Sequence, residues 1–81
     1  MDQACREMEH ALSIARNLGQ PYHLGNILFL YAQVEAMRKN TQTALEMARE
    51  SEVMLLQVFE PSHPTVQYVN AFIKMLGNET D

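Results

Sequence analysis

The chain has 81 residues, a length typical of one small domain, and 47% of them are hydrophobic. Its net charge is −4 and its basic residues are scattered, which argues against nucleic acid and against an anionic membrane surface as partners. One cysteine and no long apolar run exclude an internal disulfide and a typical membrane span, so we expect an intracellular, cytoplasmic protein.

The first predicted helix spans residues 3–18. Apolar residues recur between Ala4 and Leu18 at the spacing of one helix face. Gly19 follows where the end of a helix favours a left-handed residue, and Pro21 then breaks the chain. The second predicted helix, residues 22–39, contains "NILFLYAQV" and is apolar on nearly every side. We therefore expect neighbouring helices to cover it on more than one face.

The third predicted helix spans residues 41–59, with Asn40 closing the helix before it and Thr41 as its own cap. Its inner stripe carries small residues, which let a neighbouring helix approach closely: Ala44, Ala48 and Ser51.

The fourth predicted helix spans residues 63–76, with Ser62 as the cap and Pro64 tolerated in the first turn. Gly77 and Asn78 are expected to close it. No segment shows the sustained alternation of a strand. The sequence therefore predicts an all-α fold and one domain over residues 1–81.

The chain repeats itself weakly, with two alternating helix types and a period near forty residues. When the sequence is shifted against itself by 40 residues, Ala4 aligns with Ala44, Pro21 with Pro61 and His23 with His63. A shift of 42 residues aligns the second predicted helix with the fourth: Leu24 with Val66, Leu30 with Phe72 and Val34 with Leu76. Such a pattern is typical of a solenoid of helical hairpins.

The stretch "LYAQVEAMRKNTQTALEMARESEVMLLQVFEPSHPTV" resembles a tetratricopeptide repeat (TPR), in the long-helix form of kinesin light chains. It has a small residue, Ala32, late in the first helix, alanines in the second, and a connection similar to "G-x-x-H-P-x-V". TPR-like hairpins also close the C-terminus of SET/MYND-type methyltransferases. The resemblance covers essentially the whole chain. It implies four antiparallel helices forming a fragment of a right-handed solenoid.

The sequence departs from the repeat pattern at three positions. Lys39 replaces the glycine of the inter-helix turn, Glu35 replaces the usual aromatic residue, and Glu60 replaces the glycine of the connection. The asparagine pair that binds a peptide backbone in kinesin-light-chain repeats is Phe29-Leu30 in this chain.

The resemblance implies a protein–protein interaction scaffold whose groove, lined by first-type helices, binds a peptide or helix of a partner. Carried over to this chain, the groove comprises Asn26, Phe29, Gln33, Ala36 and Met37. An exposed Phe and Met flanked by amides would suit a short apolar or amphipathic peptide. In the alternative interpretation, Phe29 is buried against the fourth helix.

No residue pattern predicts chemistry. His63 stands between two prolines and is interpreted as a corner whose imidazole bonds nearby backbone, and Cys5 as a small packed residue. The histidines and Cys5 lack paired ligand spacing, and no nucleophile or phosphate-loop motif is present. We therefore expect no catalytic residue, no cofactor and no metal, and hence a protein that is not an enzyme.

The two ends of the predicted array differ. Lys74 stands where the second helix has Ala32, and a lysine there would obstruct a fifth helix. The apolar stripe of the N-terminal helix is only partly covered, which suggests a homo-oligomer through this helix or a piece of a longer array. The alternative function is therefore a C-terminal structural or self-association segment of a larger helical-repeat protein or multidomain enzyme, without a site of its own.

Overall fold

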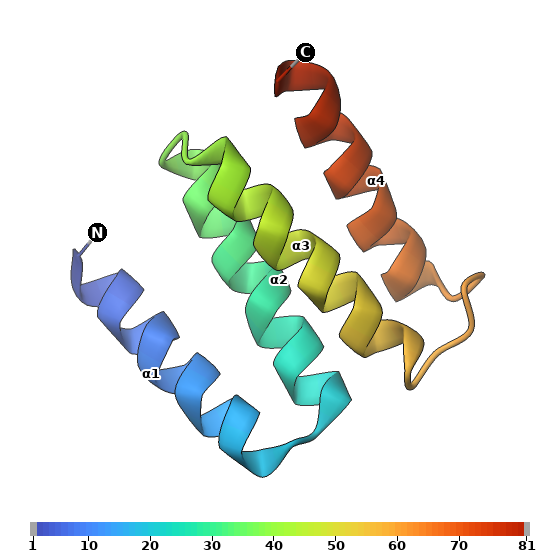
Figure 1. The fold of residues 1–81 in the computed structure, drawn as a ribbon, viewed down its shortest axis with the longest axis horizontal. Helices are drawn as coiled ribbons and strands as arrows, with labels where there is room; N and C mark the ends of the chain where they lie inside the picture. Colours follow the sequence, from blue (N-terminus) through green and yellow to red (C-terminus); the bar gives the residue numbers. More distant parts are fainter. Residues whose placement is uncertain (1, 81) are drawn as a thin grey trace.

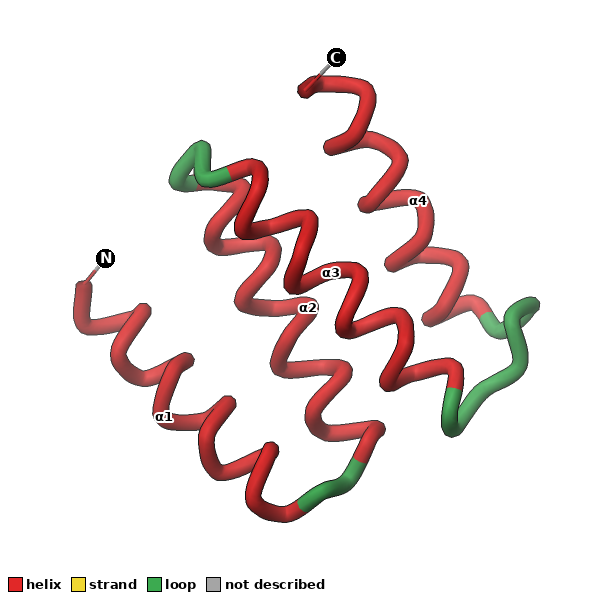
Figure 2. Tube along the Cα trace, in the orientation of Figure 1, coloured by secondary structure: helices red, strands yellow, loops and turns green. Residues whose placement is uncertain are grey.

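A computed structural model describes the backbone of residues 2–80 and the side chains of residues 6–77. Over residues 2–80 it contains four α-helices and no strand, which confirms the all-α prediction. The helices are α1 (Asp2–Leu18), α2 (Pro21–Met37), α3 (Thr41–Leu56) and α4 (Pro64–Thr80). Consecutive helices run in opposite directions, and α3 crosses in front of α2 with α1 and α4 to either side (Figure 1). Only short loops join them (Figure 2).

Two turns use left-handed residues to stop a helix. Gly19 has a φ of +66°, as predicted for the end of α1. Lys39, at the position of the repeat glycine, also has a φ of +66°, so α2 ends at Met37 and not at residue 39. Asn40 was predicted to close α2 and Thr41 to cap α3. Instead Asn40 precedes α3 and Thr41 is its first helical residue.

The connection before α4 also differs from the prediction. α3 ends at Leu56, three residues early, because the next N–H groups donate to carbonyls three residues back, Gln57 to Met54 at 3.2 Å and Val58 to Leu55 at 3.0 Å. The cap of α4 is His63 and not Ser62, since its Nδ1 accepts a hydrogen bond from the backbone N–H of Thr65 at 3.1 Å.

α4 passes through Gly77 and Asn78, which were predicted to close it, and continues to Thr80. The reason is conformational, because Gly77 does not adopt the left-handed conformation that ends α1. A glycine that keeps a helical conformation weakens a helix without stopping it.

A close seam joins α2 to α3. Ala44, Ala48 and Ser51 are fully buried, as predicted. Ser51 Oγ donates a hydrogen bond of 2.6 Å to the carbonyl of Gly25, so side chain meets backbone directly. A Cβ atom added at Gly25 would lie only 2.7 Å from Leu55 Cγ. The seam therefore depends on a residue without a side chain on α2.

The outer helices pack on this pair. Ala15 of α1 forms a buried cluster with Leu24 and Leu28 of α2. Two polar contacts tie α1 more loosely: Tyr31 Oη donates to Glu9 Oε1 at 3.0 Å, and Arg16 forms an exposed ion pair with Glu50 at 2.8 Å. α4 packs on α3 through two clusters: Leu55 with Val66 and Val69, and Ala44 and Leu45 with Leu76.

Glu35 is buried at the end of α2, where the repeat pattern has an aromatic residue. Its carboxylate accepts hydrogen bonds from Asn40 Nδ2 at 2.8 Å and from Arg38 Nη1 at 3.2 Å. A buried carboxylate is costly unless it is bonded in this way. The charge thus fixes the turn between α2 and α3, and is not available on the surface.

Candidate interaction surface

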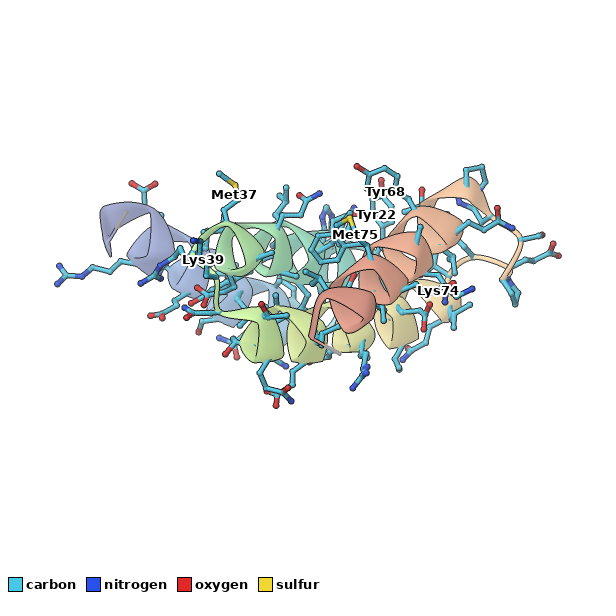
Figure 3. All side chains as sticks on the ribbon, turned by 90° about the horizontal axis from the view of Figure 1, so that it is seen from above. Tyr22, Met37, Lys39, Tyr68, Lys74 and Met75 are labelled. Atoms are coloured by element: carbon cyan, nitrogen blue, oxygen red, sulfur yellow. The ribbon has the colours of Figure 1, made fainter. Side chains whose placement is uncertain are left out.

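One side of the molecule, away from α3, carries exposed apolar side chains of α2 and α4. We call it the α2/α4 face and define it by Tyr22, Leu30, Met37, Tyr68 and Met75. Figure 3 shows Met37 and Tyr68 projecting on this side, while α3 runs along the opposite side. Met37 is 78% exposed and Tyr68 is 63% exposed. Leu30 and Met37, like Tyr68 and Met75, are seven positions apart and so share one face of their helix.

Aromatic rings hold α2 and α4 together at one point of this face. The ring of Phe29 lies 5.5 Å from that of Tyr68 and 5.2 Å from that of Phe72, nearly perpendicular to both. Such edge-to-face pairs stabilise a contact beyond the area they bury. Phe29 is half-buried by them. It therefore packs against the fourth helix, as the alternative interpretation expects.

Beyond these rings the two helices leave a hollow of about 460 Å³. Its floor belongs to the core, since Ala36 and Phe72 pack on the buried cluster around Leu76. Met37 and Met75, both exposed, stand at its margin. Methionine side chains are flexible and polarisable, and they adapt to apolar groups of varied shape. The hollow is therefore suited to receiving an apolar side chain.

The structure brings three of the five predicted groove residues into this hollow: Gln33, Ala36 and Met37. Phe29 belongs to the aromatic contact instead, and Asn26 is half-buried on α2 and does not line the hollow.

The sequence prediction missed the α4 half of the surface. The missing signal was the repeat itself, because the shift of 42 that aligns α2 with α4 places Asn26 on Tyr68 and Gln33 on Met75. Applying it to the predicted groove would have drawn both residues into the same surface.

The α2/α4 face is free of carboxylates among the described side chains. Glu35 is the one acidic residue of α2, and it is buried in its turn; α4 has none between residues 64 and 77. The other described acids lie on α1, on α3 and in the loop before α4. The described acidic side chains therefore lie away from this face.

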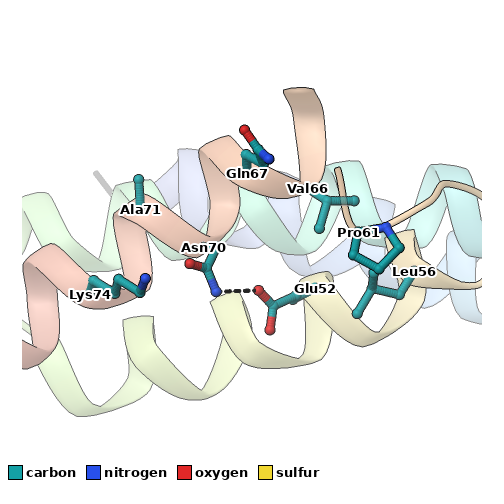
Figure 4. A pocket seen from close by; sticks show the side chains of 8 residues that line it. All are labelled: Glu52, Leu56, Pro61, Val66, Gln67, Asn70, Ala71 and Lys74. Carbon is teal, nitrogen blue, oxygen red and sulfur yellow. Dashed lines mark hydrogen bonds between the residues drawn. The ribbon is translucent and has the colours of Figure 1, made fainter. Parts of the chain in front are cut away.

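A second hollow, of about 550 Å³, lies between α3 and α4 and is lined by both polar and apolar side chains (Figure 4). Asn70 Nδ2 donates to Glu52 Oε2 at 2.9 Å in it, and Gln67 and Lys74 line it. On α2 the equivalent positions are Gly25, Leu28 and Ala32, which are buried. Where α2 offers small and apolar groups to a neighbouring helix, α4 offers amides and a lysine. Close packing of another helix is disfavoured there.

A third hollow, of about 240 Å³, lies between α1 and α2. Ile14, 47% exposed, and Leu18, 62% exposed, line it together with Ile27 of α2. This is the partly covered stripe of the N-terminal helix on which self-association was predicted.

His63 is accounted for by structure. Its imidazole accepts the cap hydrogen bond and stacks on Phe59, with ring centroids 3.9 Å apart. The prediction that this ring bonds nearby backbone is confirmed. Within the described side chains, no group of three or more His, Cys, Asp or Glu could hold a metal ion. The side chain of Cys5, predicted to be packed, lies outside the described residues.

Among the helices of the described part of the chain, none combines the length and apolarity needed to cross a membrane. Comparison with family models, with curated proteins and with solved structures finds no match to this chain.

Proposed function

We propose that this chain is a TPR-like, non-catalytic module of intracellular protein–protein interaction, and that the α2/α4 face is its binding surface. The observation that carries the proposal is the hollow between α2 and α4, which opens beside the exposed Met37 and Met75. Tyr68 continues the apolar surface along α4, and Tyr22 is exposed at the opposite end of α2. Tyrosine and methionine are enriched in protein interfaces, and charged residues are depleted at their centres.

The mechanism of binding is burial of apolar area on a preformed surface. The Phe29 contact with Tyr68 and Phe72 fixes the spacing of α2 and α4 before any partner arrives. Little ordering is therefore needed on binding, which lowers its entropic cost. Each 100 Å² of apolar surface covered contributes about 2.5 kcal/mol before those costs. The amide of Gln33, at the margin of the hollow, can fix the orientation of a peptide.

Selection from a displayed library of random peptides tests the proposal without assuming a partner. We expect the chain to enrich peptides with large apolar side chains. Met37→Glu should weaken their binding at least about 30-fold, the effect of losing one interface hot spot. Val53→Glu is the matched control, because Val53 is 54% exposed on α3, outside this face. Peptides that bind the Met37→Glu variant as tightly as the unmodified chain would refute the assignment of the surface.

A structural or self-association role through α1 is the second candidate function. The apolar hollow beside Ile14 and Leu18 favours it. Ile14→Glu would then abolish association while leaving peptide binding at the α2/α4 face unchanged. The two candidate functions are thus separated by variants on different helices.

A further inference from the structure

We infer that the α2/α4 face binds a second copy of this chain, in a two-fold symmetric dimer in which Tyr68 of each copy occupies the hollow of the other. The inference rests on the proposed binding surface and names one partner for it. Three observations carry it: a projecting ring and a hollow on the same face, the absence of carboxylates among the described side chains of that face, and the dimensions of the molecule.

The face carries a projecting group and a receiving hollow side by side. Tyr68 is 63% exposed, and a perpendicular ring contact with Phe29 holds its ring in place. The hollow at Met37 and Met75 lies one heptad further along α4, roughly 10 Å at 1.5 Å per residue. A two-fold axis that lies in the plane of the interface, midway between ring and hollow and perpendicular to the line joining them, brings each ring opposite the hollow of the other copy. Each ring then enters the other copy's hollow, as an isologous contact requires.

Charge selects a second copy over a strongly charged partner. The face has no carboxylate among the side chains of residues 6–77, so these side chains of two copies can meet there without like-charge repulsion. A meeting through α3 would bring the exposed Glu46 of both copies together, whereas Glu50 is already paired with Arg16. Juxtaposed like charges suppress association, and a neutral face offers a charged partner no attraction. The neutral face therefore suits an equally neutral surface, and its own copy supplies one.

The size of the molecule is compatible with a dimer. It measures 29 × 29 × 15 Å between Cα atoms, so the rectangle that bounds its broad side, α1 included, is about 840 Å². A standard protein interface buries about 800 Å² on each partner. The α2/α4 face is a part of that side, so a dimer on it buries less than this area on each partner, as weaker and concentration-dependent complexes do.

Sedimentation equilibrium between about 1 μM and 1 mM tests the inference. The mass should rise with concentration from that of one 9.3 kDa chain to twice that value. Tyr68→Glu and Met37→Lys should each weaken the dimer at least about 30-fold, since each change occurs twice in a symmetric interface. An equimolar mixture of the two variants should regain much of the association, because the new acid of one chain then faces the new lysine of the other. Val53→Glu should change nothing.

Circular dichroism of each variant checks that the helices are retained, which the exposure of both side chains predicts. A mass of one chain at every concentration overturns the inference. So does a dimer that survives both variants, and a mixture that stays monomeric refutes the pairing of Tyr68 with Met37. A monomer that still binds selected peptides through Met37 would leave the proposed function standing and remove this partner alone.

Discussion

Gly25→Ala tests how closely α2 and α3 must approach. The added Cβ atom would lie 2.7 Å from Leu55 Cγ and 2.8 Å from Leu55 Cδ2, well inside van der Waals contact. Leu55 cannot turn away easily, because it is fully buried and packs against Val66 and Val69. The Ser51 hydroxyl, one turn earlier on α3, donates to the Gly25 carbonyl and holds the same stretch of backbone against α3.

Two opposing effects set the magnitude. Overpacking of a core costs about 1–3 kcal/mol, whereas replacing a helical glycine by alanine contributes about 1 kcal/mol of helix propensity. The net loss of unfolding free energy should therefore be about 1 kcal/mol. Gly77→Ala is the matched control, because nothing lies within 4 Å of its added Cβ atom. That variant should gain up to about 1 kcal/mol.

Urea unfolding followed by circular dichroism measures both variants, and their difference isolates the steric cost from propensity. We expect a difference of about 1–3 kcal/mol between the two alanines. Combining Gly25→Ala with Leu55→Ala should remove the clash, so that in the Leu55→Ala background the alanine at this position becomes stabilising. Equal stability of Gly25→Ala and Gly77→Ala would refute the close seam.

Three further substitutions test the turns. Lys39→Gly should raise the free energy of unfolding by about 0.5–1 kcal/mol, because a left-handed φ is strained for lysine; Lys39→Ala, which keeps the strain, should not. His63→Ala should lower it by about 1 kcal/mol through loss of the cap, and His63→Asn should recover much of that in thermal unfolding. An asparagine as unstable as the alanine would contradict the capping role. Glu35→Ala should lower the free energy of unfolding by about 1.5–3 kcal/mol and speed trypsin cleavage after Arg38, and Glu35→Gln should have an intermediate effect. Equal cleavage rates in the alanine variant and the unmodified chain would contradict the role of the carboxylate.

The left-handed turn residues show what local pattern can and cannot specify. The positive φ of Gly19 could be predicted from the sequence, because glycine is the residue that adopts a positive φ without strain. Lys39 adopts the same φ with no such signal. Its conformation is imposed by the helices on both sides and by the Glu35 carboxylate that binds Arg38 and Asn40. Strain of this kind is offset by tertiary contacts and leaves no mark on local composition.

The cap of α4 was likewise set by tertiary contacts and not by the local sequence. Several residues of the connection could have begun the helix, and serine is a commoner cap than histidine. His63 caps the helix, because stacking on Phe59 places its Nδ1 atom against the Thr65 N–H. Phe59 in turn meets the ring of Tyr22 from α2, 5.7 Å away. This chain of ring contacts joins residues far apart in sequence and could not be read from neighbouring positions.

By itself, the sequence determined the four helices and the seam of small residues on α3. Both follow from the 3.6-residue period of apolar and small side chains, which is a local property. Only the tertiary structure decided which apolar residues remain exposed, since burial depends on the neighbour that packs against each side chain. The sequence placed both Phe29 and Met37 in the groove, but α4 half-covers Phe29 and leaves Met37 78% exposed. The hollow between α2 and α4 exists because two segments 42 residues apart lie side by side, a relation set by packing on α3.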